Sequence, residues 1–377
     1  MSSVTYESRQ GEGNCTGTTA ACLPIDRRSL ELAVGLLRDG RPVAVPTETV
    51  YGLAVDATNP NAVQRIYQIK GRPSTNPLII HIGEACGSLD ALARMGWIQG
   101  LSDQPRVASI AQRLMTAFWP GPLTILLPRG PAIPACVSAG LPYAGFRMPA
   151  HVGALWLLEK LHFPLAAPSA NKSTRISPTS AQHVMSELGA DIPLILDGGD
   201  APVGIESTVV GIESDGSLRI LRPGGLAIQE LLAAAQTSLA TTRAAPGPQL
   251  SPGMSRLHYA PTKPVILCEP QDLHRHVAEQ LGKLGGPAGV LLLDGPTSLK
   301  TELEQSSMSK GLVVRQCADA PDASGAVVAR RLFGLLRELD ESPARAILAE
   351  FPPKSRHTIG LWPAIADRLT RAGAPRA

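Results

Sequence analysis

Short apolar runs rich in β-branched residues alternate with helical patterns along the first two-thirds of this chain, and this alternation most constrains its fold. The runs 78–82 and 123–127 have the length and composition of buried strands. Further strands are expected at 42–47, 193–196, 207–212 and 218–221. The pattern predicts an α/β fold with a mixed sheet.

Two of the expected helices carry start and stop signals. Apolar residues recur at the spacing of one helical face from Leu30 to Leu37, with Asp26 placed to cap the start and Gly40 to end the helix. The second helix is expected to open at Asn59-Pro60 and to close at Gly71. A turn is expected at 48–53, directly after the strand at 42–47.

The composition changes between residues 244 and 264, where five prolines and two glycines are typical of a linker. Beyond it the pattern restarts, with strands expected at 264–268 and 289–294 and helices at 324–339 and 362–372. A length of 377 residues also favours two domains. We therefore expect a disordered tail (1–25), a large domain (26–240), a linker (241–263) and a smaller α/β domain (264–377).

Several classes of protein are disfavoured by what the sequence lacks. It has no P-loop, no GxGxxG after a strand, no GxSxG, no HExxH and no paired cysteine ligands, so we expect no metal site. The six cysteines fit idle thiols of a reducing compartment. The polar N-terminus lacks the apolar core of a signal peptide, and no apolar run approaches the roughly 18 residues of a membrane span. A cytoplasmic location without a membrane is the expectation.

Polar and cationic residues gather at the ends of the expected strands and helices. Lys70 and Arg72 close a helix within a stretch that also holds Asn76, a pattern that fits either a phosphate grip or ordinary cations of a last helical turn. Arg147 and Arg222 lie at strand ends, where a solvated position is the alternative. A second polar loop, 167–180, contains Ser169, Asn171 and Ser177. The segment Glu-Ser-Thr at 206–208 lies at the start of another expected strand. Gathered together, these residues would form a basic concave face for a polyanion such as a triphosphate.

The order of motifs resembles that of the YrdC-type threonylcarbamoyl-AMP synthases. The shared motifs, from residue 30 to residue 226, are PTETVYGL, KGRPSTNPLIIHI, FWPGPLT, FRMP, PSAN, SPTS, DGG, GIESTVV and LRPGG, and the linker sequence SPGMSRLHYAP is similar to that of the two-domain members. The resemblance implies a twisted mixed sheet around a basic cavity, with a smaller Rossmann-like C-terminal domain. It also implies conversion of L-threonine, bicarbonate and ATP to threonylcarbamoyl-AMP and pyrophosphate, for N6-threonylcarbamoyladenosine (t6A37) in tRNA.

The resemblance also implies roles for individual residues. The catalytic cations would be Lys70 and Arg72. The residues expected at L-threonine are Thr49, His81, Arg147 and Ser207. The residues expected at ATP are Lys70, Arg72, Asn76, Thr124, Ser169, Asn171, Ser177, Arg222 and Tyr259. Mg²⁺ would arrive with ATP, without a dedicated protein ligand.

The linker segment 251–261 is expected to act as a lid, with Arg256, His258 and Tyr259 covering the nucleotide. The alternative is a linker that only packs, with Tyr259 as its anchor. Two positions depart from the family pattern: Thr174 stands where glycine is usual, and Gly211 where aspartate is frequent.

Expected partners are a downstream tRNA threonylcarbamoyl-transferase complex and, weakly, tRNA. Two other functions stay open at this point. The basic face could bind double-stranded RNA without catalysis, because its phosphates need only cations. A carbamoyl-phosphate-using transferase is the other, although the acylphosphatase and zinc-finger segments of such proteins are not visible.

Overall fold

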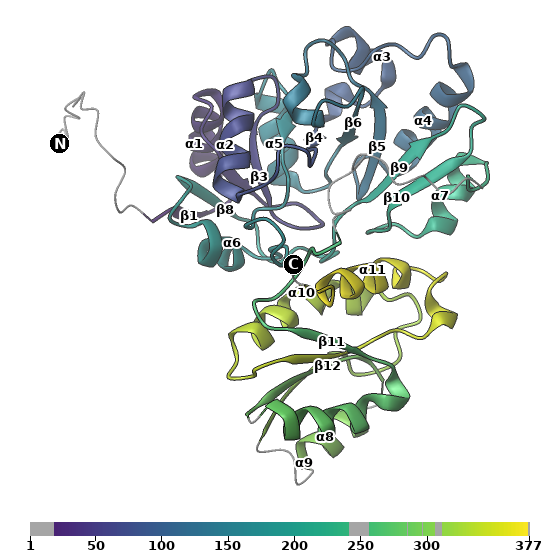
Figure 1. Ribbon diagram of the computed structural model, residues 1–377. Coiled ribbons are helices and arrows are strands. Elements are labelled where there is room, and N and C mark those ends of the chain that lie inside the picture. Colours follow the sequence, from purple (N-terminus) through teal and green to yellow (C-terminus); the bar gives the residue numbers. More distant parts are fainter. Residues whose placement is uncertain (1–18, 241–255, 285, 296, 306–310, 376–377) are drawn as a thin grey trace, which may run out of the picture.

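The computed structural model describes residues 19–240, 256–284, 286–295, 297–305 and 311–375. Within them the chain forms two α/β units, one above the other in Figure 1. The N-terminal unit, residues 19–240, holds a ten-stranded sheet, and the C-terminal unit, residues 264–375, holds a four-stranded sheet. The predicted α/β class is confirmed, whereas the predicted domain boundaries stay a prediction.

The large sheet is mixed, as predicted, with strand order β1-β8-β2-β3-β7-β4-β6-β5-β9-β10. Its strands are β1 (Ala21–Pro24), β2 (Val43–Val45), β3 (Gly52–Asp56), β4 (Ile79–His81), β5 (Leu123–Pro128), β6 (Tyr143–Arg147), β7 (Leu165–Ala166), β8 (Leu194–Asp197), β9 (Thr208–Ile212) and β10 (Leu218–Arg222). Its helices are α1 (Arg27–Arg38), α2 (Pro60–Lys70), α3 (Leu89–Arg94), α4 (Pro105–Phe118), α5 (Val152–Lys160), α6 (Ala181–Leu188) and α7 (Ile228–Ala235).

The helix signals in the sequence are confirmed. The carboxylate of Asp26 accepts a hydrogen bond from the Ser29 amide and caps α1, and Gly40 follows its end with φ +66°. The amide oxygen of Asn59 caps α2, and Gly71 ends it with φ +58°.

Two expectations near the N-terminus are wrong. Residues 21–24, expected in the disordered tail, form β1, because they pair in parallel with β8 from far along the chain. The turn expected after the first strand is shorter than predicted, since the chain re-enters the sheet at Gly52 as β3, antiparallel to β2. Residues 1–18 lie outside the described residues.

The C-terminal unit is a parallel sheet of order β11-β14-β12-β13. It consists of β11 (Val265–Cys268), α8 (Leu273–Leu284), β12 (Ala288–Asp294), α9 (Thr297–Gln305), β13 (Leu312–Ala318), α10 (Ala326–Glu341), β14 (Ile347–Glu350) and α11 (Trp362–Ala372). Parallel neighbours need helical crossovers, which makes this unit Rossmann-like, as predicted. Short 3₁₀ turns lie at Glu84–Cys86, Ala135–Ser138, Pro270–Asp272 and Lys354–Arg356.

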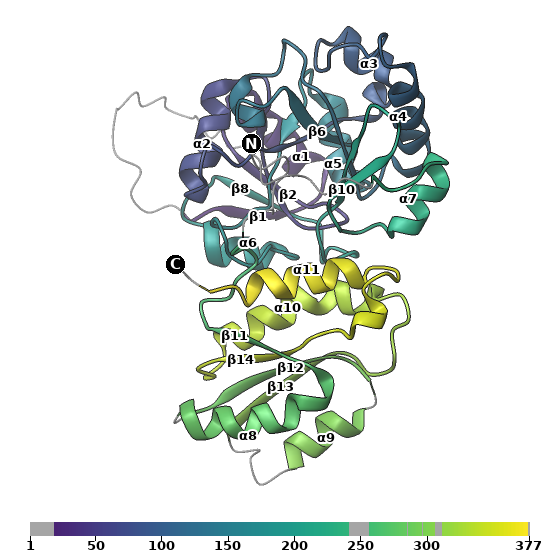
Figure 2. The same ribbon diagram turned by 45° about the vertical axis from the view of Figure 1, so that its right-hand side comes forward.

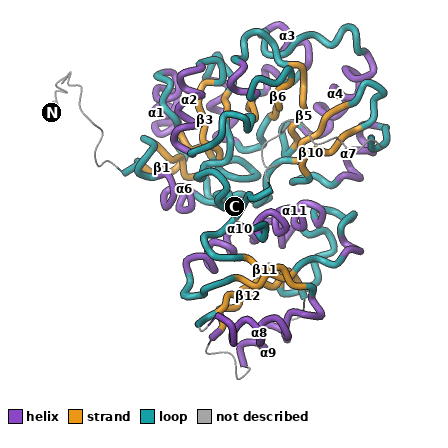
Figure 3. The backbone as a smooth tube through the Cα atoms, viewed as in Figure 1, coloured by secondary structure: helices purple, strands orange, loops and turns teal. Residues whose placement is uncertain are grey.

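Helices α10 and α11 lie on the face of the small sheet that is turned toward the N-terminal unit, and α8 and α9 cover the opposite face (Figures 1 and 2). An apolar core joins the two units: Val50, Ile176 and Ile205 from the first pack in one cluster with residues of α10 and α11. Loops of the N-terminal unit, teal in Figure 3, fill the region above these helices. The two units therefore form a shared, buried interface.

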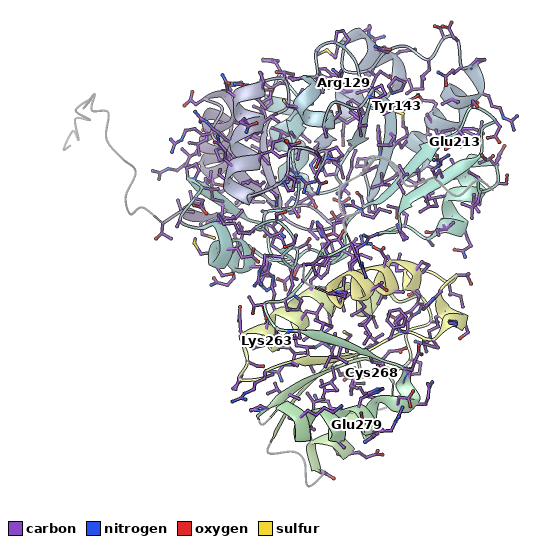
Figure 4. The ribbon with its side chains drawn as sticks, viewed as in Figure 1. Arg129, Tyr143, Glu213, Lys263, Cys268 and Glu279 are labelled. Atoms are coloured by element: carbon purple, nitrogen blue, oxygen red, sulfur yellow. The ribbon has the colours of Figure 1, made fainter. Side chains whose placement is uncertain are left out.

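The linker reaches the C-terminal unit beside α10. The ammonium of Lys263, labelled in Figure 4, donates to the backbone carbonyls of Leu339, Asp340 and Ser342 at the end of that helix. The carboxylate of Asp340 in turn accepts from Thr262 and from the Lys263 amide. Residues 241–255 of the predicted linker lie outside the described residues.

Candidate active site

A small buried cavity opens in the N-terminal unit where the ends of several strands meet the linker. Its free volume is about 40 Å³, far below the roughly 300–1,000 Å³ typical of small-molecule sites. Eight of the predicted site residues line it: Thr49, Arg72, His81, Arg147, Ser169, Ser207, Arg222 and Tyr259. A larger hollow of about 420 Å³ lies between α6 and α10, but none of the predicted site residues line it.

The register between β4 and β6 positions two residues on one side of the cavity. β4 and β6 are parallel, and His81 is paired with Arg147 at their C-terminal ends. Burial, with a further contribution from the charge of Arg147, holds the pKa of His81 well below its usual value, so the imidazole is neutral. Thr49 adds a hydroxyl that is hydrogen-bonded to the Thr47 hydroxyl at 2.9 Å.

Arg147 itself is paired inside the protein. One of its terminal nitrogens lies 2.6 Å from a carboxylate oxygen of Glu48, and its Nε donates to the Gly121 carbonyl. The other oxygen of Glu48 accepts from the Ala150 amide at 2.9 Å. Glu48 therefore fixes the guanidinium and balances its buried charge.

Two further cations line the cavity from other segments. The guanidinium of Arg72 donates to the side chain and carbonyl of Asn76, and burial lowers its pKa to about 10. Arg222 donates to both the carbonyl and the hydroxyl of Ser207. That hydroxyl also lies 2.8 Å from the hydroxyl of Thr124. Arginines from α2's end, β6 and β10 thus converge on one hollow, as the sequence predicted.

Five predicted site residues do not line the cavity but support those that do. Lys70 is buried and donates to the carbonyls of Ser169 and Asn171, and burial followed by the charge of Arg72 places its pKa well below the usual value. Asn76 and Thr124 hold Arg72 and Ser207, as described above. The Asn171 side-chain nitrogen donates to the carbonyls of Lys172 and Arg175, and its side-chain oxygen is buried with no partner among the described residues. The fifth, Ser177, donates to Glu206.

Sequence reasoning missed several residues of the site. Thr47 lines the cavity and Glu48 supports it, whereas Glu206, which also lines it, belongs to the 206–208 segment expected there. Thr47 and Glu48 lie inside a motif that had been singled out, so their motif membership was a usable signal. Arg368 of α11, which pairs with Glu206 at 2.9 Å, had no such signal.

The linker closes the cavity with His258 and Tyr259, both of which line it and are buried. The Tyr259 ring stacks on Phe333 of α10, with centroids 5.5 Å apart. Its hydroxyl, like Nδ1 of His258, is buried without a hydrogen-bond partner within the described part of the chain. Tyr259 thus lines the cavity and anchors the linker on the C-terminal unit, while Arg256 is exposed.

The backbone conformation at Thr174 shows why glycine is usual at this position in the family. Thr174 has φ +67°, a left-handed conformation that favours glycine, and its carbonyl accepts from the Ala260 amide of the linker at 2.8 Å. At Gly211 an added Cβ would meet only Leu221, at 3.9 Å, so a side chain there fits.

No cluster of three or more histidine, cysteine, aspartate or glutamate side chains suited to a metal ion occurs among the described residues. The carboxylate in the cavity, Glu206, is already engaged by Arg368 and Ser177. Mg²⁺ prefers phosphate oxygens, water and one or two carboxylates. These residues fit a metal that enters as part of Mg·ATP. In the described portion of the chain no helix is long and apolar enough to cross a membrane.

The fold and the site define a two-unit α/β protein with a buried arginine-rich cavity, lined by the N-terminal unit and the linker. Residues 35–224 match the family model described as "Telomere recombination", named for Sua5, YciO and YrdC. Residues 226–374 match the model "Threonylcarbamoyl-AMP synthase, C-terminal domain". The chain belongs to the Sua5/YciO/YrdC family, in its two-domain form.

Full-length relatives agree. The threonylcarbamoyl-AMP synthase of Pyrococcus abyssi is 35% identical, over 93% of this chain and 96% of that protein. The Bacillus subtilis enzyme of the same name is 37% identical, over 91% and 92%. The crystal structure of P. abyssi Sua5 complexed with L-threonine superposes with a TM-score of 0.77 at 34% identity, covering 95% of this chain and 98% of that one.

Proposed function

We propose that the protein is an L-threonylcarbamoyladenylate synthase, a nucleotidyltransferase that converts L-threonine, bicarbonate and ATP to threonylcarbamoyl-AMP and pyrophosphate. The observation that carries this proposal is the convergence of Arg72, Arg147 and Arg222 with neutral His81 on one cavity, in a chain whose full-length relatives carry that enzyme name. The product would feed the t6A37 modification of tRNA.

Arg147 is suited to the carboxylate of L-threonine, because a guanidinium forms two parallel hydrogen bonds with a carboxylate. Thr49 and Ser207 add hydroxyls on the same cavity wall, and His81 presents a neutral imidazole that can accept a hydrogen bond. Neutral His81 and cationic Arg147 together match the amine and the carboxylate of an amino acid.

Arg72 and Arg222 are suited to the phosphates of ATP, since both are buried cations on the cavity wall. Ser169 and the Tyr259 hydroxyl complete the lining that faces the nucleotide in this proposal. Asn76, Thr124, Asn171 and Ser177 would act by holding these groups. Lys70 would reach a phosphate only after its ammonium leaves the carbonyls of the 169–171 loop.

The chemistry needs positioning more than covalent catalysis. The free amine of threonine forms a C–N bond to the carbon of CO₂ and loses a proton, or to the carbon of bicarbonate with loss of water. Either route gives a carbamate that is unstable in water. A carbamate oxygen then attacks the α-phosphorus of Mg·ATP in line, and the bond to pyrophosphate breaks. Arg72 and Arg222 offset the charge that grows on the leaving group. A closed cavity protects the carbamate.

The linker would open for Mg·ATP, because about 40 Å³ of free volume cannot hold a nucleotide. His258 and Tyr259 are the two residues of the cavity wall that come from the linker, so withdrawal of the linker would enlarge the site. A cytoplasmic location, transfer of the product to a downstream tRNA threonylcarbamoyl-transferase complex and weak tRNA binding belong to the same proposal.

The test is a pyrophosphate-release assay in which threonine, bicarbonate and ATP are omitted in turn, with threonylcarbamoyl-AMP identified by mass spectrometry. Product should appear only when all three are present. Pyrophosphate release without threonine would contradict the proposal. An RNA-binding module is disfavoured because Arg72, Arg147 and Arg222 are buried, so the phosphates of a duplex could not reach them.

A further inference from the structure

Arg368 of α11 is the feature of the C-terminal unit that the proposed chemistry leaves unexplained. Its side chain is fully buried, which is rare for arginine and requires partners for the charge. It lies in the C-terminal unit, on a helix that faces the N-terminal unit (Figures 1 and 2). Of the four residues that its guanidinium contacts as described below, three belong to the N-terminal unit or the linker.

The first partner is Glu206, whose Oε2 accepts from both Nε and Nη2 of Arg368, at 3.1 and 2.9 Å. The other oxygen of Glu206 accepts from the hydroxyl of Ser177. Burial alone would raise the pKa of Glu206, but the charges of Arg368 and Arg222 and the bond from Ser177 outweigh it and lower the pKa. A carboxylate on the cavity wall is thus held, charged and oriented, by a residue of the other unit.

The remaining contacts reach two more segments of the site. Nη1 of Arg368 donates to the carbonyl of Pro223 at 2.6 Å, in the turn directly after Arg222. The guanidinium carbon also lies 5.0 Å from the centroid of the Tyr259 ring, a cation–π distance. Asp367, the residue before Arg368 on α11, accepts from Nη1 of Arg368 at 3.1 Å.

We propose that Arg368 is a positioning residue through which the C-terminal unit sets the geometry of the catalytic cavity and the closed position of Tyr259. The inference rests on the proposed function. One planar guanidinium fixes Glu206, the turn after Arg222 and the linker ring at once, so the cavity is complete only when the C-terminal unit is docked. The C-terminal unit thereby acts on catalysis without lining the cavity within the described residues.

The competing explanation is that Arg368 only holds the two units together and has no effect on the site. Arg337 provides a matched control for this possibility. Arg337 is also a buried arginine of the C-terminal unit, and it donates across the same interface to Glu187 and to the Ile176 carbonyl. Neither Arg337 nor Glu187 lines the cavity. Arg368→Met and Arg337→Met should therefore both lower the melting temperature.

Only Arg368→Met should change the kinetics, with a rise of about ten- to a hundredfold in KM for ATP or an equal fall in kcat, because small misplacements of binding groups have effects of that size. Arg368→Lys keeps the positive charge but loses the paired N–H donors of the guanidinium. It should therefore recover part of the activity that Arg368→Met loses. Affinity for a non-hydrolysable ATP analogue, measured by calorimetry, should fall in parallel and needs no turnover.

Equal kinetics and equal analogue affinity for Arg368→Met and the wild type would overturn the proposal. If Arg368→Met does not fold, Arg368→Lys and the double variant Arg368→Met/Glu206→Gln, which leaves no orphaned buried charge, carry the same comparison. Normal ATP affinity in both would also overturn it. A wild-type protein that binds the analogue but forms no threonylcarbamoyl-AMP would instead contradict the proposed function, and the affinity comparison would still decide the role of Arg368.

Discussion

Arg147 and Glu48 form a buried ion pair, with 2.6 Å between guanidinium and carboxylate, at the wall of the cavity. Both side chains are shielded from water, so each charge depends on the other. The same guanidinium is our proposed ligand for the carboxylate of L-threonine. The pair therefore links the stability of the free protein to substrate binding.

Glu48→Gln should lower the free energy of unfolding by about 3–5 kcal/mol, because it leaves a buried guanidinium without its counter-charge. Saturating L-threonine should restore more stability to this variant than to the wild type, since its carboxylate supplies the missing anion. Thermal melts with L-threonine, and with L-threoninol as the analogue that lacks the carboxylate, measure this. Equal shifts in both proteins would remove Arg147 as the carboxylate ligand.

Tyr259→Phe should leave stability unchanged or slightly higher, because the buried hydroxyl has no partner in the described part of the chain while the ring keeps its stacking on Phe333. Affinity for ATP should fall about three- to tenfold if the hydroxyl bonds the nucleotide. Tyr259→Ala also removes the packed ring, which costs about 3–5 kcal/mol, so Tyr259→Phe is the variant that isolates the hydroxyl. Calorimetric titration with ATP is the measurement. Unchanged affinity in Tyr259→Phe would leave Tyr259 as an anchor only.

Gly204→Ala should weaken the contact between the two units. An added Cβ would lie 2.4 Å from Cα of Arg330 in α10, and Gly204 has φ +77°. We expect a loss of about 1–2 kcal/mol from the backbone and about 1–3 kcal/mol from overpacking. Gly199→Ala is the control, since Gly199 has φ +78° with nothing within 4 Å of the new atom. Urea unfolding that gives both variants the same loss would show that α10 moves aside freely.

Acid should destabilise the protein before its carboxylates titrate. Burial, followed by nearby arginine and lysine charges, holds the pKa values of His81 and His258 well below 6.5 in the folded state. As pH falls through 6.5, the unfolded chain binds protons that the folded chain refuses, so stability is lost at up to about 1.4 kcal/mol per pH unit for each group.

Urea unfolding at pH 7.5, 6.5 and 5.5 measures this slope. His81→Asn should reduce it, whereas His162→Gln, which changes an exposed histidine, should not. A stability that is constant over this range would contradict the burial of neutral histidines.

Local signals explain which elements were predictable. The starts of α1 and α2 depend on Asp26 and Asn59, side chains within three positions of the amides they cap. β7, of two residues, has no pattern of its own and exists because β3 and β4 flank it in the sheet. β1 exists only through its pairing with β8.

The α/β class, the capped helices and the motif set that carries the cavity arginines could all be predicted from the residues, because periodicity, capping and short motifs are local properties of a chain. Which of those polar residues face the cavity and which support it, as with Arg72 and Lys70, depends on how the folded chain brings the motifs together. Folding alone also brings Arg368 to Glu206, 162 positions away. A buried charge is stable only where the folded chain supplies a partner for it. Because Arg368 and Glu206 are far apart in the sequence, no local pattern predicts that they pair.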